Sequence, residues 1–281
     1  MSTLDLWYNH NELLNILLIR GTVMAESYNR HDISDELWNL IEPHTIGNKG
    51  TRGGKAKDTR LFINAVFWIL RTGAPWRDLP PTYGNWNNVN RRFCRWRDKD
   101  IWERIFLAII GTNECEWLLI DASFVKAHKH AHGAIGGSKR HRSLKRGANS
   151  KIHLSVDETG RPVRVIITAG TINDCTKAEE LTEDIEYDVL IADRGYDTNA
   201  IVDKAKQKNA EVVIPSKRSR KIQREHDKEK YKTRHIIENI FATLKEWRGI
   251  ATRYAKYTKS YLAAVQIACF FAWGKTIVDR A

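Results

Sequence analysis

Two kinds of hydrophobic pattern divide this chain of 281 residues near residue 112. Between residues 32 and 112, apolar residues recur every three or four positions, which is the spacing of amphipathic helices. From residue 116 onward, short apolar runs of strand length alternate with helical patterns. The pattern therefore predicts an all-α domain at 32–112 and an α/β domain at 113–281, preceded by an N-terminal extension at 1–31.

Local signals mark the ends of the first two helices in the N-terminal domain. Ser34 is suited to cap a helix that Pro43 ends. Asp58 or Thr59 is suited to cap a second helix, which Gly73 stops. We therefore expect helices on both sides of a glycine-rich and basic loop.

The third expected helix, at residues 86–97, carries arginines on the side away from its apolar residues, and a fourth helix is expected near 101–109. Helices joined by short turns, one of them rich in arginine, predict a helix-turn-helix-like module that binds DNA. The alternative is a helical cap whose arginines only face solvent. The candidate DNA contacts on this helix are Arg91, Arg92 and Arg95.

The second domain shows three successive strand patterns and then an alternation of helix and strand. A hairpin turn is expected at residues 157–160, between the second and third strands. This order of elements predicts a mixed sheet of the RNase-H-like kind. Strands are expected at 117–121, 151–157, 162–168, 188–193 and 211–214, and helices at 176–185, 198–208, 231–247 and 260–274.

Three acidic residues of this domain occupy positions from which their side chains can converge. Asp121 and Asp193 each end an apolar run of strand length. Glu238 lies in a predicted helix that can pack against the same sheet. Carboxylate oxygens are the ligands that hard divalent cations such as Mg²⁺ prefer. A basic protein that gathers acids at one point is therefore expected to hold metal for cutting nucleic acid.

Glu238 shares its helical face with three other polar residues. At about 100° per residue, Tyr231, Arg234, Glu238 and Lys245 fall within an arc of roughly 60°. The alternative is a solvated helix on which Arg234 and Glu238 form an ordinary ion pair four residues apart. The two aspartates at strand ends favour the metal-site interpretation.

The same residues carry a resemblance to a known family. The spacing Tyr231-x2-Arg234-x3-Glu238-x6-Lys245 resembles the tyrosine-arginine-glutamate-lysine signature of DDE transposases from bacterial insertion sequences. The stretches around the two aspartates are similar to the aspartate blocks of the insertion-sequence-five branch of the insertion-sequence-four-like superfamily. The similarity runs through nearly the whole chain. It implies an RNase-H-like catalytic core and transposase activity.

Metal chemistry indicates how such a site would work. Asp121 is expected to bridge two Mg²⁺ ions, for which Mn²⁺ can substitute, while Asp193 holds one ion and Glu238 the other. One ion activates water, and later a DNA 3′-hydroxyl, and the other stabilises the leaving oxygen. The resemblance implies that phosphate near the scissile bond is bound by Tyr231, Arg234 and Lys245.

The resemblance also implies the partners of the protein. The substrates are double-stranded DNA at the ends of the element and at the target. The N-terminal domain is expected to recognise the terminal inverted repeats, and the pairing of two ends implies a homodimer in the synaptic complex. Two alternatives stay open: an RNase-H-like nuclease that cuts without strand transfer, and a catalytically silent DNA-binding repressor.

Composition agrees with a polyanionic partner. The 46 lysines and arginines exceed the 34 aspartates and glutamates, and the net charge of +12 favours phosphate contacts. The four cysteines have no paired spacing, which predicts reduced thiols in a cytoplasmic protein. The resemblance implies that the protein is bacterial and nucleoid-associated. No apolar run has the length of a membrane span or the flanks of a signal peptide. Met24 is an alternative start to Met1.

Two basic stretches lie close to the candidate acids in the sequence. The first falls between Asp121 and Asp157, contains no acidic residue and is expected to grip a DNA strand. The second, at 217–234, is either a solvated linker or a DNA-facing loop that orders on binding. Asp157, Asp174 and Asp197 are interpreted as turn residues or caps. The candidate DNA contacts in the first stretch are Lys139, Arg140, Arg142, Lys145 and Arg146.

Overall fold

The computed structural model describes residues 32–46, 58–111, 114–131 and 149–278 of the chain. From Ile33 onward the residues belong to one compact unit. Within the described ranges, no helix combines the length and the apolar character needed to cross a membrane.

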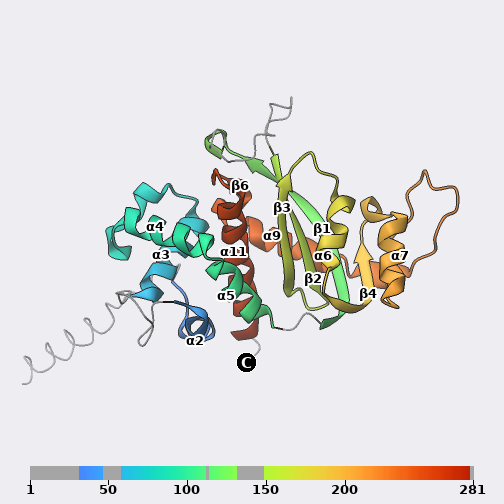
Figure 1. Ribbon diagram of the computed structural model, residues 1–281, viewed down its shortest axis with the longest axis horizontal. Helices are drawn as coiled ribbons and strands as arrows, with labels where there is room; N and C mark the ends of the chain where they lie inside the picture. The colour runs from blue at the N-terminus through green and yellow to red at the C-terminus, as the bar shows by residue number, and fades with distance from the viewer. Residues whose placement is uncertain (1–31, 47–57, 112–113, 132–148, 279–281) are drawn as a thin grey trace, which may run out of the picture. The chain divides into compact units, whose positions relative to one another are not determined.

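A mixed sheet forms the centre of the second half of the chain (Figure 1). Its strands follow the order β3-β2-β1-β4-β5, and β6 pairs with the end of β1. The first three strands are antiparallel neighbours, whereas β4 runs parallel to β1 and β5 runs parallel to β4. This arrangement confirms the predicted RNase-H-like sheet. The strand bounds are β1 Glu114–Ala127, β2 Asn149–Asp157, β3 Pro162–Ala169, β4 Glu186–Ala192, β5 Glu211–Val213 and β6 Thr252–Arg253.

Helices cover both faces of this sheet (Figure 1). Successive side chains of a strand point to opposite faces. Leu119 of β1 therefore packs with residues of α9 and α11, while Leu118 and Ile120 pack with residues of α6 and α7. Asp121 lies two residues after Leu119 on β1, so its side chain points to the same face of the sheet, toward α9. The helices of this half are α6 Ala178–Thr182, α7 Asn199–Gln207, α8 Lys228–Lys232, α9 His235–Lys245, α10 Arg248–Ala251 and α11 Thr258–Val278.

The described residues before the sheet are helical, as the apolar spacing predicted. The Ser34 side chain caps α2 by accepting from the Leu37 N–H, and the Asp58 side chain caps α3 by accepting from the Leu61 N–H. Gly73 ends α3 with a φ of 68°, a left-handed conformation that favours glycine. The elements are α2 Asp35–Ile41, η1 Glu42–His44, α3 Thr59–Thr72, η2 Trp76–Asp78, η3 Pro81–Tyr83, α4 Trp86–Asp98 and α5 Ile101–Ile110.

One continuous core joins these helices to the sheet. Trp96 and Trp102 are buried, and their rings contact each other at a tilt of 52° with centroids 4.9 Å apart. The same core cluster contains Leu119 of β1 and Phe270 of α11. Helix α11 contacts α2 and α5 on one side and β3 on the other. The change of pattern near residue 112 therefore separates two kinds of secondary structure that share a core.

The predicted helix at 231–247 is wrong in one respect, because the chain turns between α8 and α9. Tyr231 lies on α8, and Arg234 is the N-cap residue of α9. The Thr233 hydroxyl donates to the Lys230 carbonyl oxygen over 2.7 Å, and the Arg234 N–H bonds to the Tyr231 carbonyl oxygen. Local hydrogen bonds of this kind compete with continued α-helical bonding. The helical-wheel argument thus applies to Glu238 and Lys245 only.

Candidate active site

Asp121 and Asp193 lie side by side because β1 and β4 are parallel neighbours. Ile120 is opposite Ala192 in this pair of strands, so the two aspartates occupy the next step of each. Asp193 caps the short helix η6 (Arg194–Tyr196), where its Oδ1 accepts from the Gly195 N–H over 2.8 Å. A Cβ on Gly195 would lie 2.8 Å from that oxygen, so glycine permits this close approach.

Arg234 connects Asp121 to Glu238. One of its terminal nitrogens lies 2.9 Å from Oδ2 of Asp121, and the other pairs with Oε1 of Glu238. Glu238 stands in the first turn of α9, which packs over this face of the sheet. The structure therefore places Asp121 and Glu238 against the same guanidinium, and Asp193 lines a pocket together with Arg234.

Burial dominates the electrostatics of Asp121, whose side chain is only 16% exposed. Burial, with a smaller effect of the neighbouring Asp193, raises the pKa of Asp121 to about 6, although the Ala122 N–H and Arg234 oppose the change. Burial alone lowers the pKa of Arg234, but Asp121 and Glu238 raise it overall. The positive charge at Arg234 thus compensates the acids only in part.

The predicted metal-ligand set is not assembled in this arrangement. In the described ranges, no group of three or more His, Cys, Asp or Glu side chains is placed to hold a metal ion. The physical reason is that Arg234 supplies the counter-charge between Asp121 and Glu238. The donor chemistry still fits a hard divalent cation, because all three candidates offer carboxylate oxygens. A cation bound by all three would have to displace this guanidinium.

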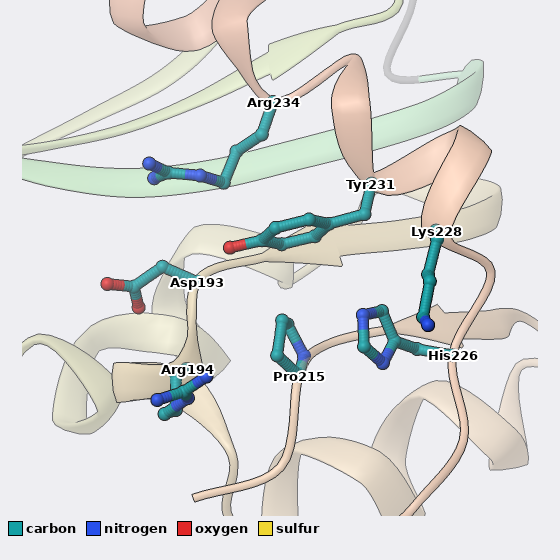
Figure 2. A pocket seen from close by; sticks show the side chains of 7 residues that line it. All are labelled: Asp193, Arg194, Pro215, His226, Lys228, Tyr231 and Arg234. Atoms are coloured by element: carbon teal, nitrogen blue, oxygen red, sulfur yellow. The ribbon is translucent and has the colours of Figure 1, made fainter.

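A pocket of about 420 Å³ opens beside Asp193. Figure 2 shows the phenol group of Tyr231 pointing toward Asp193, with Arg234 on one side of its ring. The rings of Tyr231 and His226 meet edge to face with centroids 5.5 Å apart. Sequence reasoning did not single out Pro215, His226 and Lys228, of which only the last two fall in the basic stretch at 217–234. The lining residues are Asp193, Arg194, Pro215, His226, Lys228, Tyr231 and Arg234.

The remaining signature residue, Lys245, lies near the same strand. Its Nζ donates to Oγ of Ser123 over 2.5 Å, and Ser123 shares the Asp121 side of β1. Lys245 is exposed, so its ammonium is accessible to a further partner. Together, the three predicted acids and the three predicted phosphate contacts border one region of the molecule.

The candidate DNA contacts on α4 differ from one another. Arg91 and Arg95 are exposed. The Arg92 guanidinium lies 4.3 Å from the Phe62 ring centroid and donates to Oγ1 of Thr59 over 2.8 Å. Burial lowers the pKa of Arg92 to about 10. We therefore withdraw Arg92 as a DNA contact, because its guanidinium is already used inside the helical region.

The contacts predicted in the first basic stretch cannot be placed, because they lie outside the described residues. They are Lys139, Arg140, Arg142, Lys145 and Arg146.

Two protein families match this chain, and the boundary between the two matches falls where the hydrophobic pattern changes. Residues 33–106 match a family described as a putative transposase of the IS4/5 family, and residues 116–272 match a family described as a transposase DDE domain. An uncharacterized protein, y4sN of Sinorhizobium fredii, is 34% identical over 102 residues, which cover 36% of this chain and 82% of that protein. A putative transposase for insertion sequence element IS6501 of Brucella ovis is 32% identical over 128 residues, which cover 44% of this chain and 97% of that protein. A piggyBac transposase from a synaptic complex with hairpin DNA aligns over 89% of this chain and 77% of its own, with 11% identity and a TM-score of 0.38.

Proposed function

Because this chain belongs to the DDE transposase family of insertion sequences, we propose that it binds the terminal inverted repeats of its element, cleaves DNA there and transfers the 3′-hydroxyl ends to target DNA. The observation that supports this proposal is that Arg234 pairs with both Asp121 and Glu238 and lines one pocket with Asp193. Acids held near one guanidinium in a protein of net charge +12 are suited to metal-assisted chemistry on a polyanion.

These carboxylates would form the metal site. Transposases of this family generally use divalent metal ions, and Asp121, Asp193 and Glu238 would hold two Mg²⁺ ions, with Mn²⁺ as a substitute. When bound, the ions would activate the attacking hydroxyl and stabilise the leaving oxygen. Asp121 is suited to this role because the protein compensates the charge of its carboxyl only in part.

Arg234 would change partners when DNA binds. A phosphodiester offers two oxygens to the planar guanidinium, as a carboxylate does. The transfer of Arg234 from Asp121 and Glu238 to a DNA phosphate would free the oxygens of both acids. Tyr231 and Lys245 border the same region and would bind the backbone there. In this mechanism DNA binding prepares the acids for metal.

The remaining parts of the proposal concern partners and place. Arg91 and Arg95 on α4 would contact the element ends, and two protomers would pair the two ends as a homodimer. The protein would act on the nucleoid in the bacterial cytoplasm.

The test replaces Asp193 by asparagine, which preserves its size and removes its charge. Asp193→Asn should abolish Mg²⁺-dependent nicking of element-end DNA while end binding persists in a gel-shift assay. Asp188→Asn is the matched control, because Asp188 is exposed and lies on β4, the strand that ends just before Asp193. Full nicking by Asp193→Asn would contradict the assignment. A labelled 3′-end joining assay then separates a transposase from a nuclease, since only the transposase links donor to target.

A further inference from the structure

Residues 215–227, here named the connecting segment, join β5 to α8 without a helix or a strand of their own. Hydrogen bonds hold the segment in a defined path. The Arg224 N–H donates to Oγ of Ser216 over 2.7 Å, and Nε2 of Gln223 donates to the Arg220 carbonyl oxygen over 2.7 Å. Pro215 and His226, near its two ends, line the pocket beside Asp193 (Figure 2). The path of this segment therefore shapes the pocket.

Asp197 anchors the connecting segment to the rest of the fold. It is the C-cap residue of η6, as predicted, but its side chain is 1% exposed and, among the described residues, hydrogen-bonds to this segment. Its Oδ2 accepts from the Lys217 N–H and from Nε of Arg220, each over 2.8 Å. Its Oδ1 accepts from Nη1 of Arg224 over 2.8 Å. Both carboxylate oxygens thus hold parts of one segment.

A second acceptor strengthens the same attachment. Oδ1 of Asn199, at the start of α7, accepts from Nη1 of Arg220 over 2.9 Å and from Nη2 of Arg224 over 2.7 Å. Each guanidinium therefore bonds to two side chains that precede or begin α7. Planar guanidinium groups with two fixed partners give geometric specificity that a single ammonium cannot.

Two guanidinium groups compensate the single negative charge of Asp197 at this attachment. Burial alone raises the pKa of Asp197, but the hydrogen bonds from Arg220 and from the Lys217 N–H, with the charges of both arginines, lower it overall. A buried carboxylate that loses such partners is strongly unfavourable. Asp197 and the two arginines therefore form a unit in which each member depends on the others.

We propose that Asp197 is a positioning residue for DNA cleavage, which holds the connecting segment through Arg220 and Arg224 as a preformed wall of the pocket beside Asp193. This inference rests on the proposed function. It replaces the expectation that the second basic stretch is a linker or a loop that orders on binding. Two of its arginines serve the fold, while Arg218 and Lys221 remain exposed for phosphate.

The first test measures the attachment without DNA. Hydrogen exchange followed by mass spectrometry on the full chain reports opening of the segment. Asp197→Asn should speed exchange of the Lys217 and Arg224 amides by at least about tenfold, because hydrogen bonds to a charged group are lost. Exchange in β4 should stay unchanged. Asp203→Asn, an exposed aspartate on α7, is the matched control and should leave the segment protected. Unchanged exchange in Asp197→Asn overturns the proposal, whatever the activity of the protein.

The second test connects the attachment to chemistry. At saturating element-end DNA, Asp197→Asn and Arg224→Ala should each lower the cleavage rate by at least about tenfold. The double variant should cleave no more slowly than the single variants, because the effects of coupled residues do not add. Asp203→Asn, the control of the first test, should leave the saturated cleavage rate unchanged.

The outcomes separate this proposal from the function on which it rests. A wild-type protein without cleavage would refute the proposed function, and the exchange experiment would still decide whether Asp197 holds the segment. Additive losses in the double variant, or an unchanged saturated rate for Arg224→Ala, would refute the positioning role. If Asp197→Asn fails to fold, Arg224→Ala decides the question, because Arg224 is half-buried on the segment itself.

Discussion

Replacement of Asp121 by asparagine should stabilise the metal-free protein at neutral pH while it abolishes DNA cleavage. Asp121 is half-buried on the α9 side of β1, and its charge is only partly compensated by Arg234. Asparagine has nearly the same size and can still accept from the Ala122 N–H. The substitution therefore removes the unfavourable burial of charge without leaving a cavity.

The magnitude follows from the pKa of Asp121. One pH unit of difference between folded and unfolded pKa corresponds to about 1.4 kcal/mol. The pKa of Asp121 rises from 3.8 to about 6, which corresponds to about 3 kcal/mol at a pH above both values. Below the lower value the carboxyl is protonated in both states, so the penalty for its buried charge is absent.

The sign of the pH dependence follows from the same shift. Because the pKa of Asp121 is raised in the folded state, its favourable contribution is complete below pH 3.8 and is lost as the pH rises through about 6. The advantage of Asp121→Asn in free energy of unfolding should therefore grow between about pH 4 and 7 and then level off.

Urea unfolding in the presence of a chelator, monitored by tryptophan fluorescence from pH 4.5 to 8, measures this difference directly. Asp188→Asn, an exposed substitution on β4, should change the free energy of unfolding by less than about 0.5 kcal/mol at every pH. A constant difference between Asp121→Asn and wild type over this pH range would refute the reasoning. A lower free energy of unfolding for Asp121→Asn than for wild type at pH 8 would also refute it.

Two further predictions concern single contacts. Gly195→Ala would place a Cβ 2.8 Å from Oδ1 of Asp193. The rate of cleavage at saturating DNA should therefore fall by about tenfold or more, because a misplaced catalytic group loses much of its effect. An unchanged cleavage rate would show that Asp193 tolerates displacement. Arg92→Ala should lower the free energy of unfolding by about 1 to 3 kcal/mol through lost packing and hydrogen bonding, whereas Arg91→Ala should change stability little and weaken DNA binding. Thermal unfolding and gel-shift titration of both variants decide between these roles, and equal effects of the two on DNA binding would contradict them.

Local patterns predicted those features that depend on a few consecutive residues. Ser34 and Asp58 cap helices because their side chains reach an N–H within the first turn, which a short stretch of sequence already specifies. Asp121 and Asp193 each follow an apolar strand pattern, and parallel pairing then brings them to the same step of the sheet. Such positions can be inferred from sequence because strand period and strand order together determine them.

Features that depend on long-range pairing could not be inferred in the same way. The pattern of α4 separates apolar from basic positions, but it does not show that Arg92 lies over the Phe62 ring. The ion pair of Arg234 with Glu238 was an explicit alternative, and it is present together with a bond to Asp121 that no local spacing indicates. The same holds for Asp197 and Arg224, whose contact joins segments 27 residues apart in the chain.

Asp121, which is half-buried, and Asp197, which is buried, show how two aspartates of one fold differ in their roles. The pKa of Asp197 is lowered overall, because two arginines and a backbone N–H compensate its charge despite burial. The pKa of Asp121 is raised to about 6 by burial, because one shared guanidinium does not compensate it. A structural acid gains from complete compensation, whereas an acid that must accept a cation has to retain unsatisfied charge. Divalent metal should therefore stabilise the wild-type protein once DNA draws Arg234 away, and it should have no such effect on Asp121→Asn.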